Sequence, residues 1–66
     1  DERSSLAFKR SIYVVEDIKE GEKFTNKNIR IIRPGDGLKP KYFNEIIGRF
    51  SARDIQRGTA LSWELI

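Results

Sequence analysis

One 13-residue pattern occurs twice in this sequence, as DIKEGEKFTNKNI at residues 17–29 and as DIQRGTALSWELI at residues 54–66. The two copies align without gaps at an offset of 37 residues (54 − 17). A glycine, the apolar residues that flank it and a hydroxyl residue recur at the same positions in both copies. Together they predict a structural repeat. The identical pairs are Asp17/Asp54, Ile18/Ile55, Gly21/Gly58 and Ile29/Ile66, and the similar pairs are Phe24/Leu61 and Thr25/Ser62.

Both copies predict the same local structure. Asp-Ile ends a strand, and the glycine three residues further on permits a tight turn with positive φ. Asp17 and Asp54 are expected to accept hydrogen bonds from nearby backbone amides in these turns. The next apolar residue re-enters the core, and Thr25 or Ser62 caps a single helical turn. Two half-domains related by an approximate twofold would then share one small core.

The segments between the copies predict further short elements. SIYVV (11–15), IRIIRP (29–34, with Pro34 ending the pairing) and RFSA (49–52) are typical of strands. PKYFNEII (40–47) predicts a short helix that begins at a proline and is closed by Gly48. Residues 1–10, DERSSLAFKR, are polar and charged and are interpreted as a linker, so the domain is expected to span residues 11–66. The fold class is therefore mostly β with single-turn helices.

Size and composition restrict the chemistry. A 66-residue chain is at most one domain, and a core of this size usually needs a disulfide, a metal or a partner for support. The chain has no cysteine and no histidine, which excludes disulfide scaffolds, zinc knuckles and Ser-His or Cys-His nucleophiles. A partner surface is the remaining support. No apolar run approaches membrane-spanning length, and the N-terminal residues are too polar for a signal peptide.

Positive charge is concentrated around the loop IRPGDGLKP (32–40). Residues 30–41 contain four basic residues and one acidic residue, and this equals the formal net charge of +3 for the whole chain. A solvated basic loop explains this pattern, and so does a loop that faces a phosphate, a carboxylate or an acidic protein surface. The residues concerned are Arg30, Arg33, Lys39 and Lys41, with Asp36 as the acidic one.

Arg33 is the candidate binding residue of this loop. Pro34 restricts the backbone of Arg33 to extended angles, and Gly35 and Gly37 let the chain turn close to a neighbour. An arginine in a stiff frame loses less freedom when its guanidinium forms several hydrogen bonds. The alternative is an internal salt bridge from Arg33 to an acidic residue such as Asp36 or Glu45.

Other candidate sites have simpler explanations. Gly35 and Gly37 of the loop do not fit the spacing of the P-loop motif GxxxxGK(S/T) or of the dinucleotide-binding motif GxGxxG. The aromatic residues near basic ones could stack on nucleic-acid bases, but a domain this small needs most of its aromatics in the core. Trp63 is expected in the core or at an interface. The carboxylates that could form an acid–base pair are Asp17, Asp54, Glu16 and Glu20, and the aromatics are Tyr13, Phe24, Tyr42, Phe43 and Phe50.

RSIYVVEDIKEGEKFTNKNIRIIRPGDGL, Gly48 and the closing DIQRGTALSWELI resemble the SAF, or antifreeze-like, domain at the C-terminus of sialic acid synthases. The resemblance covers about residues 8–66. The D-I-x-x-G turns recur across SAF domains, whereas the IRPGDG loop between two such turns is more specific to the synthases. GLKPKYFNEIIG and ALSWELI look more like pseudaminic acid synthases than N-acetylneuraminate synthases.

This resemblance implies a β-clip fold with internal pseudo-twofold symmetry. The parent enzyme would carry an N-terminal (β/α)₈ barrel with a divalent metal, manganese or magnesium. It would condense phosphoenolpyruvate with an N-acetylated sugar to a nine-carbon 2-keto acid. In a domain-swapped homodimer, this domain would cover the active site of the other subunit. Arg33, on the loop of Pro34, Gly35, Asp36 and Gly37, would reach the N-acetyl group of the sugar.

This reading implies a cytoplasmic enzyme with no nucleic-acid or membrane partner, in which the 66 residues are not catalytic by themselves. N-acetylneuraminate synthase is one alternative, and a stand-alone glycan or nucleic-acid binding module is another. A chain with 35% charged residues is a poor candidate for ice binding, which needs a flat, mostly uncharged face. Other SAF-bearing proteins, such as sugar-acid dehydratases and flagellar or pilus assembly factors, offer no reason for the R-P-G-x-G loop.

Overall fold

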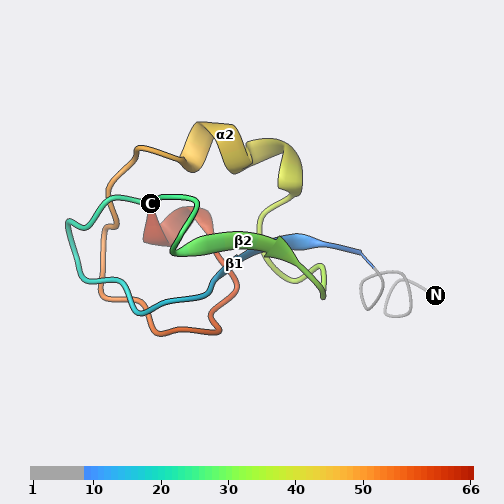
Figure 1. The fold of residues 1–66 in the computed structure, drawn as a ribbon, viewed down its shortest axis with the longest axis horizontal. Helices are drawn as coiled ribbons and strands as arrows, with labels where there is room; N and C mark the ends of the chain where they lie inside the picture. Colours follow the sequence, from blue (N-terminus) through green and yellow to red (C-terminus); the bar gives the residue numbers. More distant parts are fainter. Residues whose placement is uncertain (1–8) are drawn as a thin grey trace.

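The computed structural model describes residues 9–66, and its regular elements are short (Figure 1). Two strands and three helical turns are connected by long turns and loops in this part of the chain. The expected mostly β architecture with single-turn helices is confirmed. The elements are β1 (Ser11–Val14), β2 (Ile29–Ile32), the 3₁₀ turn η1 (Pro40–Tyr42), α2 (Phe43–Ile46) and the 3₁₀ turn η2 (Trp63–Leu65).

The two strands form an antiparallel pair in which Ser11 lies opposite Ile32 and Val14 lies opposite Ile29. Alternate residues of a strand point to opposite faces, so Ile12 and Val14 enter the core together, and both are fully buried. The other edge of β1 bonds to later segments, because Ile12 N–H donates to the Leu38 carbonyl and Val14 N–H donates to the Thr59 carbonyl, both at 2.9 Å. β1 is therefore the central strand of the domain.

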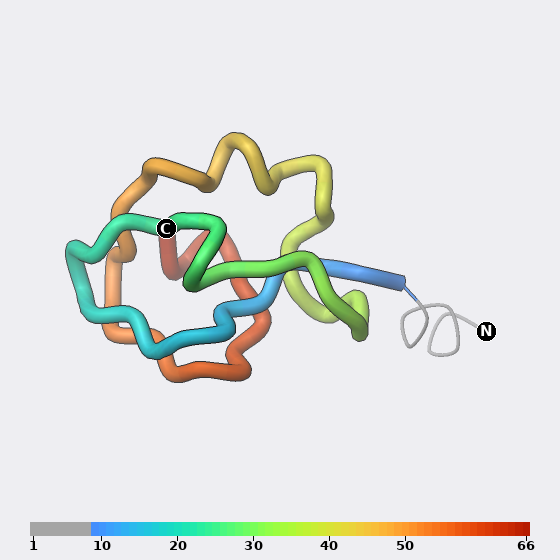
Figure 2. Tube along the Cα trace, viewed as in Figure 1, coloured from blue at the N-terminus to red at the C-terminus, as the bar shows by residue number. Residues whose placement is uncertain are grey.

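Backbone hydrogen bonds confirm the 37-residue repeat. Gly21 N–H donates to the Ser51 carbonyl at 2.8 Å, and Gly58 N–H donates to the Val14 carbonyl at 2.7 Å. Each residue of the first bond lies 37 positions from its counterpart in the second. The two copies meet where Ile18 and Ile55 form an antiparallel bridge. Figure 2 shows the corresponding segments running side by side at the end of the molecule opposite the start of β1.

The glycine turns follow the prediction, whereas the aspartates differ from it. Gly21 and Gly58 have φ of 83° and 91°, as expected for the tight turn of each copy. Asp17 and Asp54 do accept backbone amides, but not those of their own turns. Arg57 N–H donates to Asp17 Oδ1, and Glu20 N–H donates to Asp54 Oδ1, each at 2.8 Å. Because the chain reverses between the copies, each aspartate bonds to the turn of the other copy and joins the half-domains.

One apolar cluster from both copies forms the core. Phe24 is the largest of its fully buried side chains, and Leu61 is its counterpart in the second copy. The polar side chains buried around the cluster have hydrogen-bond partners within the described part of the chain. The buried apolar residues are Ile12, Val14, Ile18, Phe24, Ile29, Ile46, Ile55 and Leu61.

The prediction that the aromatics pack inside is wrong for Phe50 and only partly right for others. Phe50 is 60% exposed, and Lys23 Nζ lies 5.7 Å from its ring centroid. Trp63 is 46% exposed and contacts Tyr42 edge-on, with 5.1 Å between ring centroids. Tyr13, Tyr42 and Phe43 are half-buried. Tyr42 and Phe43 pack on the outside of the core cluster, which is too small to enclose every ring.

Three local expectations have different outcomes: the strand at 49–52 is wrong, the capping is partly right, and the helix over 40–47 is confirmed. Residues 49–52 form a single bridge, Phe50 to Lys23, instead of a strand, although Phe24 N–H donates to the Arg49 carbonyl and Ser51 N–H donates to the Glu22 carbonyl, both at 2.8 Å. Ser62 precedes η2 without a side-chain capping bond, whereas the hydroxyl of Thr25 accepts Lys27 N–H at 3.2 Å. The helix predicted over 40–47 consists of η1 followed by α2, and Gly48 closes it with φ of 92°.

Candidate functional site

The loop of residues 33–38 is bound tightly to the start of β1. Ser11 Oγ donates to the Pro34 carbonyl at 2.6 Å and accepts Gly37 N–H at 2.9 Å. Ser11 itself is only 1% exposed, whereas Pro34 and Gly37 are half-buried, so these bonds are partly shielded from water. One hydroxyl therefore closes the loop at both ends, and sequence reasoning did not identify this residue. In the sequence, Ser11 is marked only as a small polar residue at the start of a β-rich run.

Gly37 lets the loop approach the strand this closely. A Cβ atom at this position would collide with the backbone carbonyl of Ile12 and would lie 3.2 Å from both Leu61 N and Ser11 Oγ. Leu38 then continues the attachment, because its N–H donates to the Leu61 carbonyl at 2.9 Å. The stiffness predicted from glycine and proline content thus has a second source, which is direct hydrogen bonding of the loop to β1 and to the second copy of the repeat.

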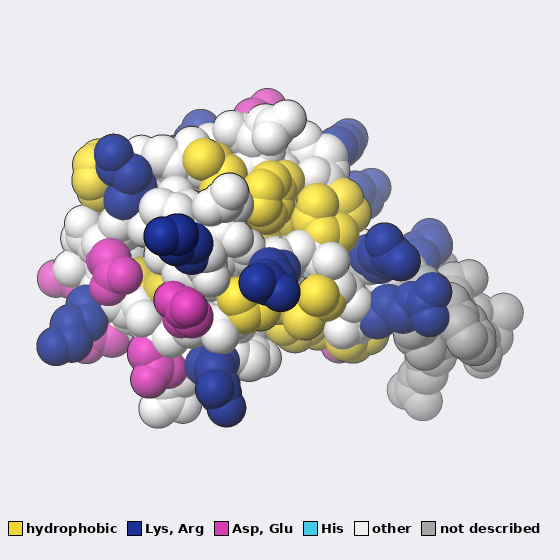
Figure 3. All heavy atoms as spheres, viewed as in Figure 1, with side chains coloured by type: hydrophobic (Ala, Val, Ile, Leu, Met, Phe, Trp, Pro, Cys, Tyr) yellow, Lys and Arg dark blue, Asp and Glu magenta, His cyan; other side chains and the backbone are white. Residues whose placement is uncertain are grey.

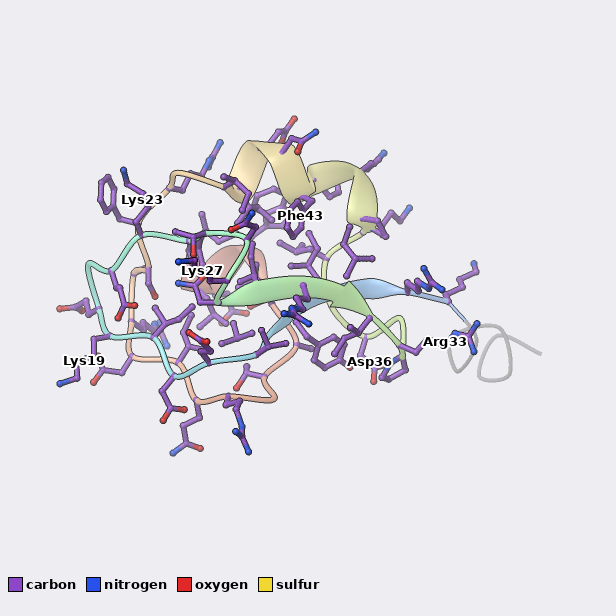
Figure 4. The ribbon with its side chains drawn as sticks, viewed as in Figure 1. Lys19, Lys23, Lys27, Arg33, Asp36 and Phe43 are labelled. Carbon is purple, nitrogen blue, oxygen red and sulfur yellow. The ribbon has the colours of Figure 1, made fainter. Side chains whose placement is uncertain are left out.

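Arg33 begins this loop, immediately after β2, and its side chain is exposed. In Figure 4 it lies with Asp36 at the end of the molecule beyond β2, away from the two repeat turns. Within residues 9–66 it forms no ion pair with Asp36 or Glu45, so the predicted alternative of an internal salt bridge is not found in this part of the chain. The Arg33–Pro34 peptide bond is cis.

Asp36 turns toward β1 instead of toward Arg33. The Tyr13 hydroxyl donates to Asp36 Oδ2 across a long 3.5 Å. Partial burial raises the pKa of Tyr13 above its ordinary value, and the nearby Asp36 carboxylate raises it further, because both disfavour a tyrosinate. Tyr13 therefore remains a neutral donor at physiological pH.

Basic side chains dominate the surface at this end of the domain. Lys9, Arg10, Arg30 and Arg33 are all exposed. Figure 3 shows dark blue groups gathered at one end of the described surface, and a hydrophobic area between α2 and β2. An exposed guanidinium on a fixed backbone, in positive surroundings, is suited to a carbonyl oxygen or an anionic ligand.

The described residues offer little other chemistry. Asp17 and Asp54 are occupied by backbone amides, which agrees with the structural interpretation of these carboxylates. Within residues 9–66 no three acidic side chains come together in a way that could hold a metal ion. None of the helices in the described part of the chain is long and apolar enough to cross a membrane.

Known proteins are similar to this chain in sequence and in fold. Residues 9–66 match the SAF domain. The chain belongs to the SAF domain family. It is 44% identical to pseudaminic acid synthase of Campylobacter jejuni over 54 residues, which cover 82% of this chain and 16% of that protein. It is 31% identical to N,N'-diacetyllegionaminic acid synthase of Legionella pneumophila over 58 residues, which cover 88% of this chain and 16% of that protein.

A solved structure confirms the expected β-clip fold. The spore coat polysaccharide biosynthesis protein SpsE of Bacillus subtilis superimposes with a TM-score of 0.87 at 35% identity, covering 98% of this chain and 19% of the other. The chain is thus an SAF domain similar to those of pseudaminic acid synthases and related nonulosonic acid synthases. It spans about a sixth of the length of the synthases that it matches.

Proposed function

We propose that this SAF domain is the C-terminal, substrate-covering part of a nonulosonic acid synthase, most similar to the pseudaminic acid enzymes. The full-length enzyme would condense phosphoenolpyruvate with an N-acetylated sugar, release phosphate and form a nine-carbon 2-keto acid. The domain would place Arg33 on the N-acetyl group of the sugar in the active site of the partner subunit. The 66 residues would not be catalytic alone.

The main support is the position of Arg33 on a rigid loop within a domain that resembles the synthases. An exposed arginine on a flexible segment would lose considerable side-chain and backbone freedom on binding. Here Ser11 and Gly37 have already fixed the backbone next to Arg33. The 44% identity to a pseudaminic acid synthase against 31% to a legionaminic acid synthase supports the pseudaminic assignment within this proposal.

A guanidinium suits the proposed ligand chemically. It presents several N–H donors and no acceptor, and the oxygen of an N-acetyl group is a planar acceptor. Such a charge-assisted hydrogen bond is stronger than one between neutral groups. The frame for this arginine would consist of Pro34, Gly35, Asp36 and Gly37. Asp36 is directed to Tyr13, which would leave the guanidinium available to the ligand.

The remaining components lie outside this chain in the proposal. The N-terminal (β/α)₈ barrel would hold phosphoenolpyruvate and a divalent metal, manganese or magnesium, which would act as a Lewis acid toward the sugar carbonyl. Within the described residues no acidic cluster suits that metal. The barrel of the opposite subunit in a homodimer would bury part of this small domain. A cytoplasmic location belongs to the same proposal, and a cysteine-free sequence is compatible with it.

The test replaces Arg33 with alanine in the full-length enzyme and follows phosphate release while the N-acetylated sugar is varied. A hydrogen bond to a charged group contributes about 1.5–3 kcal/mol, so kcat/KM for the sugar should fall roughly 10- to 150-fold. The KM for phosphoenolpyruvate should remain nearly unchanged. Arg30→Ala is the matched control, because Arg30 is another exposed arginine on the adjoining strand.

Unchanged kinetics of the Arg33→Ala enzyme would contradict the proposal. Equal losses for both arginine variants would indicate a general electrostatic effect of the basic surface instead of a specific contact. The alternative of a stand-alone binding module predicts binding by the isolated domain. If its ligand were a nucleic acid, the affinity would fall steeply with salt. The synthase proposal predicts little binding by the isolated domain.

A further inference from the structure

Ser11 holds the chain on both sides of Arg33. Its backbone lies opposite Ile32 in the β1–β2 pair, and its hydroxyl donates to the carbonyl of Pro34. Arg33 is the single residue between these two positions. The same hydroxyl accepts Gly37 N–H and so also closes the far end of the loop.

We propose that Ser11 is a positioning residue for Arg33 and thereby for the sugar, an inference that rests on the proposed function above. Without the hydroxyl, the Pro34 carbonyl and the Gly37 N–H would lose a shared partner that is itself buried beneath the loop. The loop would then occupy a wider range of positions. A misplacement of about 1 Å in a group that positions substrate can reduce the rate on the order of 100-fold.

Ser51 provides a matched control for burial. It is 3% exposed, similar to Ser11, and its hydroxyl likewise bonds to backbone groups, namely the carbonyl and N–H of Arg53. These bonds lie within the turn at residues 51–53, in the other half of the domain. Ser51→Ala therefore removes a buried hydroxyl without removing any bond to the loop of residues 33–38.

Gly37→Ala disturbs the loop by a second route. Its added methyl group would collide with the Ile12 backbone carbonyl, so the loop must move although the Ser11 hydroxyl remains. If both Ser11→Ala and Gly37→Ala impair use of the sugar, the common cause is loop position. This variant also keeps the inference testable if Ser11→Ala reduces folding.

The experiment measures kcat and KM for the sugar and for phosphoenolpyruvate in the full-length enzyme, with Ser11→Ala made alone and together with Arg33→Ala. We expect Ser11→Ala to lower kcat/KM for the sugar about 10-fold, less than the loss of Arg33 itself, with the phosphoenolpyruvate KM unchanged. In the Arg33→Ala background, adding Ser11→Ala should lower kcat/KM for the sugar hardly any further, because the residue that Ser11 positions is absent. Thermal unfolding of every variant identifies losses due to instability.

Two results would overturn the positioning role while leaving the proposed function intact. One is a Ser11→Ala effect no larger than that of Ser51→Ala. The other is an undiminished Ser11→Ala effect in the Arg33→Ala background, which would mean that Ser11 acts on general stability. If Arg33→Ala itself had no effect on sugar kinetics, the proposed function and the positioning role would both be wrong.

Discussion

Ile18 and Ile55 exchange two backbone hydrogen bonds where the two copies of the repeat meet. Ile18 N–H donates to the Ile55 carbonyl at 2.8 Å, and Ile55 N–H donates to the Ile18 carbonyl at 2.7 Å. The two residues occupy the same position of the repeat, so the bonds are related by the approximate twofold. Both side chains are buried, at 1% and 4% exposure. The copies are therefore joined through equivalent residues.

Truncation of this pair should destabilise the whole domain. Ile55→Ala removes a buried side chain and leaves a cavity at the contact between the copies, which should lower the free energy of unfolding by about 2–5 kcal/mol. Urea unfolding of the chain followed by circular dichroism measures this change. Gln56→Ala is the control, because Gln56 is exposed and should change stability by less than about 0.5 kcal/mol. Equal effects of the two substitutions would contradict this view of the core.

Asp17 and Asp54 should stabilise the fold through the hydrogen bonds that they accept from backbone N–H groups. Asp54→Ala removes the acceptor of Glu20 N–H and should cost about 0.5–2 kcal/mol of stability. Asp54→Asn retains a carbonyl oxygen and should cost less. Glu16→Ala removes another exposed carboxylate and serves as the control for charge. An Asp54→Ala chain as stable as the Glu16→Ala chain would show that the bond between the copies contributes nothing.

Replacing a turn glycine should lower the stability of the domain because of its positive φ, and not because of steric crowding. Gly58 has φ of 91°, and a Cβ atom there would meet no other atom within 4 Å. Gly58→Ala should therefore lower stability by about 1–2 kcal/mol through conformational strain alone. Thermal unfolding monitored by circular dichroism measures this loss. A substitution without cost would mean that the turn can adopt negative φ.

Stability should decrease in alkaline solution because of Tyr13. Its pKa is raised in the folded chain by burial and by Asp36, while in the unfolded chain it is about 10. The neutral phenol thus favours folding below pH about 10, and this contribution is lost as the pH rises through the folded pKa. Tyr13→Phe should remove that part of the decrease. Unfolding of the wild-type and Tyr13→Phe chains, measured across alkaline pH, should show this as a difference in how their stability depends on pH.

Absorbance titration of tyrosinate assigns the group directly. In a Tyr42→Phe background Tyr13 is the only tyrosine, since the chain has two. Asp36→Asn should lower the pKa of Tyr13 partway toward its ordinary value, because the charge is removed while the burial remains. If Asp36→Asn left the titration unchanged, the two side chains would not interact.

Much of the fold could be predicted because it depends on local rules applied twice. The glycine turns, the proline start of the short helix and the repeat itself all follow from residue types and spacing. The strand predicted over residues 29–34 is also present, but it ends at Ile32. The partners of Asp17 and Asp54 could not be predicted, because the sequence pattern does not show which turn lies opposite each carboxylate. Phe50 was misassigned for a similar reason, since the sequence pattern does not show that its bridge to Lys23 leaves the ring 60% exposed.

The candidate site could be predicted less completely. Arg33 stood out through its position between a strand and Pro34 and through the excess positive charge nearby. Ser11 did not, because its role depends on contacts to Pro34 and Gly37, which lie 23 and 26 residues away in the sequence. A serine is also an ordinary residue at the start of a strand, so nothing in its local surroundings marked it.

The most direct test of the Arg33 assignment combines the variant with a change of substrate. Full-length wild-type and Arg33→Ala enzymes would be compared on the N-acetylated sugar and on the same sugar without its N-acetyl group. Arg33→Ala should reduce kcat/KM roughly 10- to 150-fold on the N-acetylated sugar and have little effect on the analogue, because the contact is already missing there. The same loss on both sugars would contradict an Arg33 contact with the N-acetyl group.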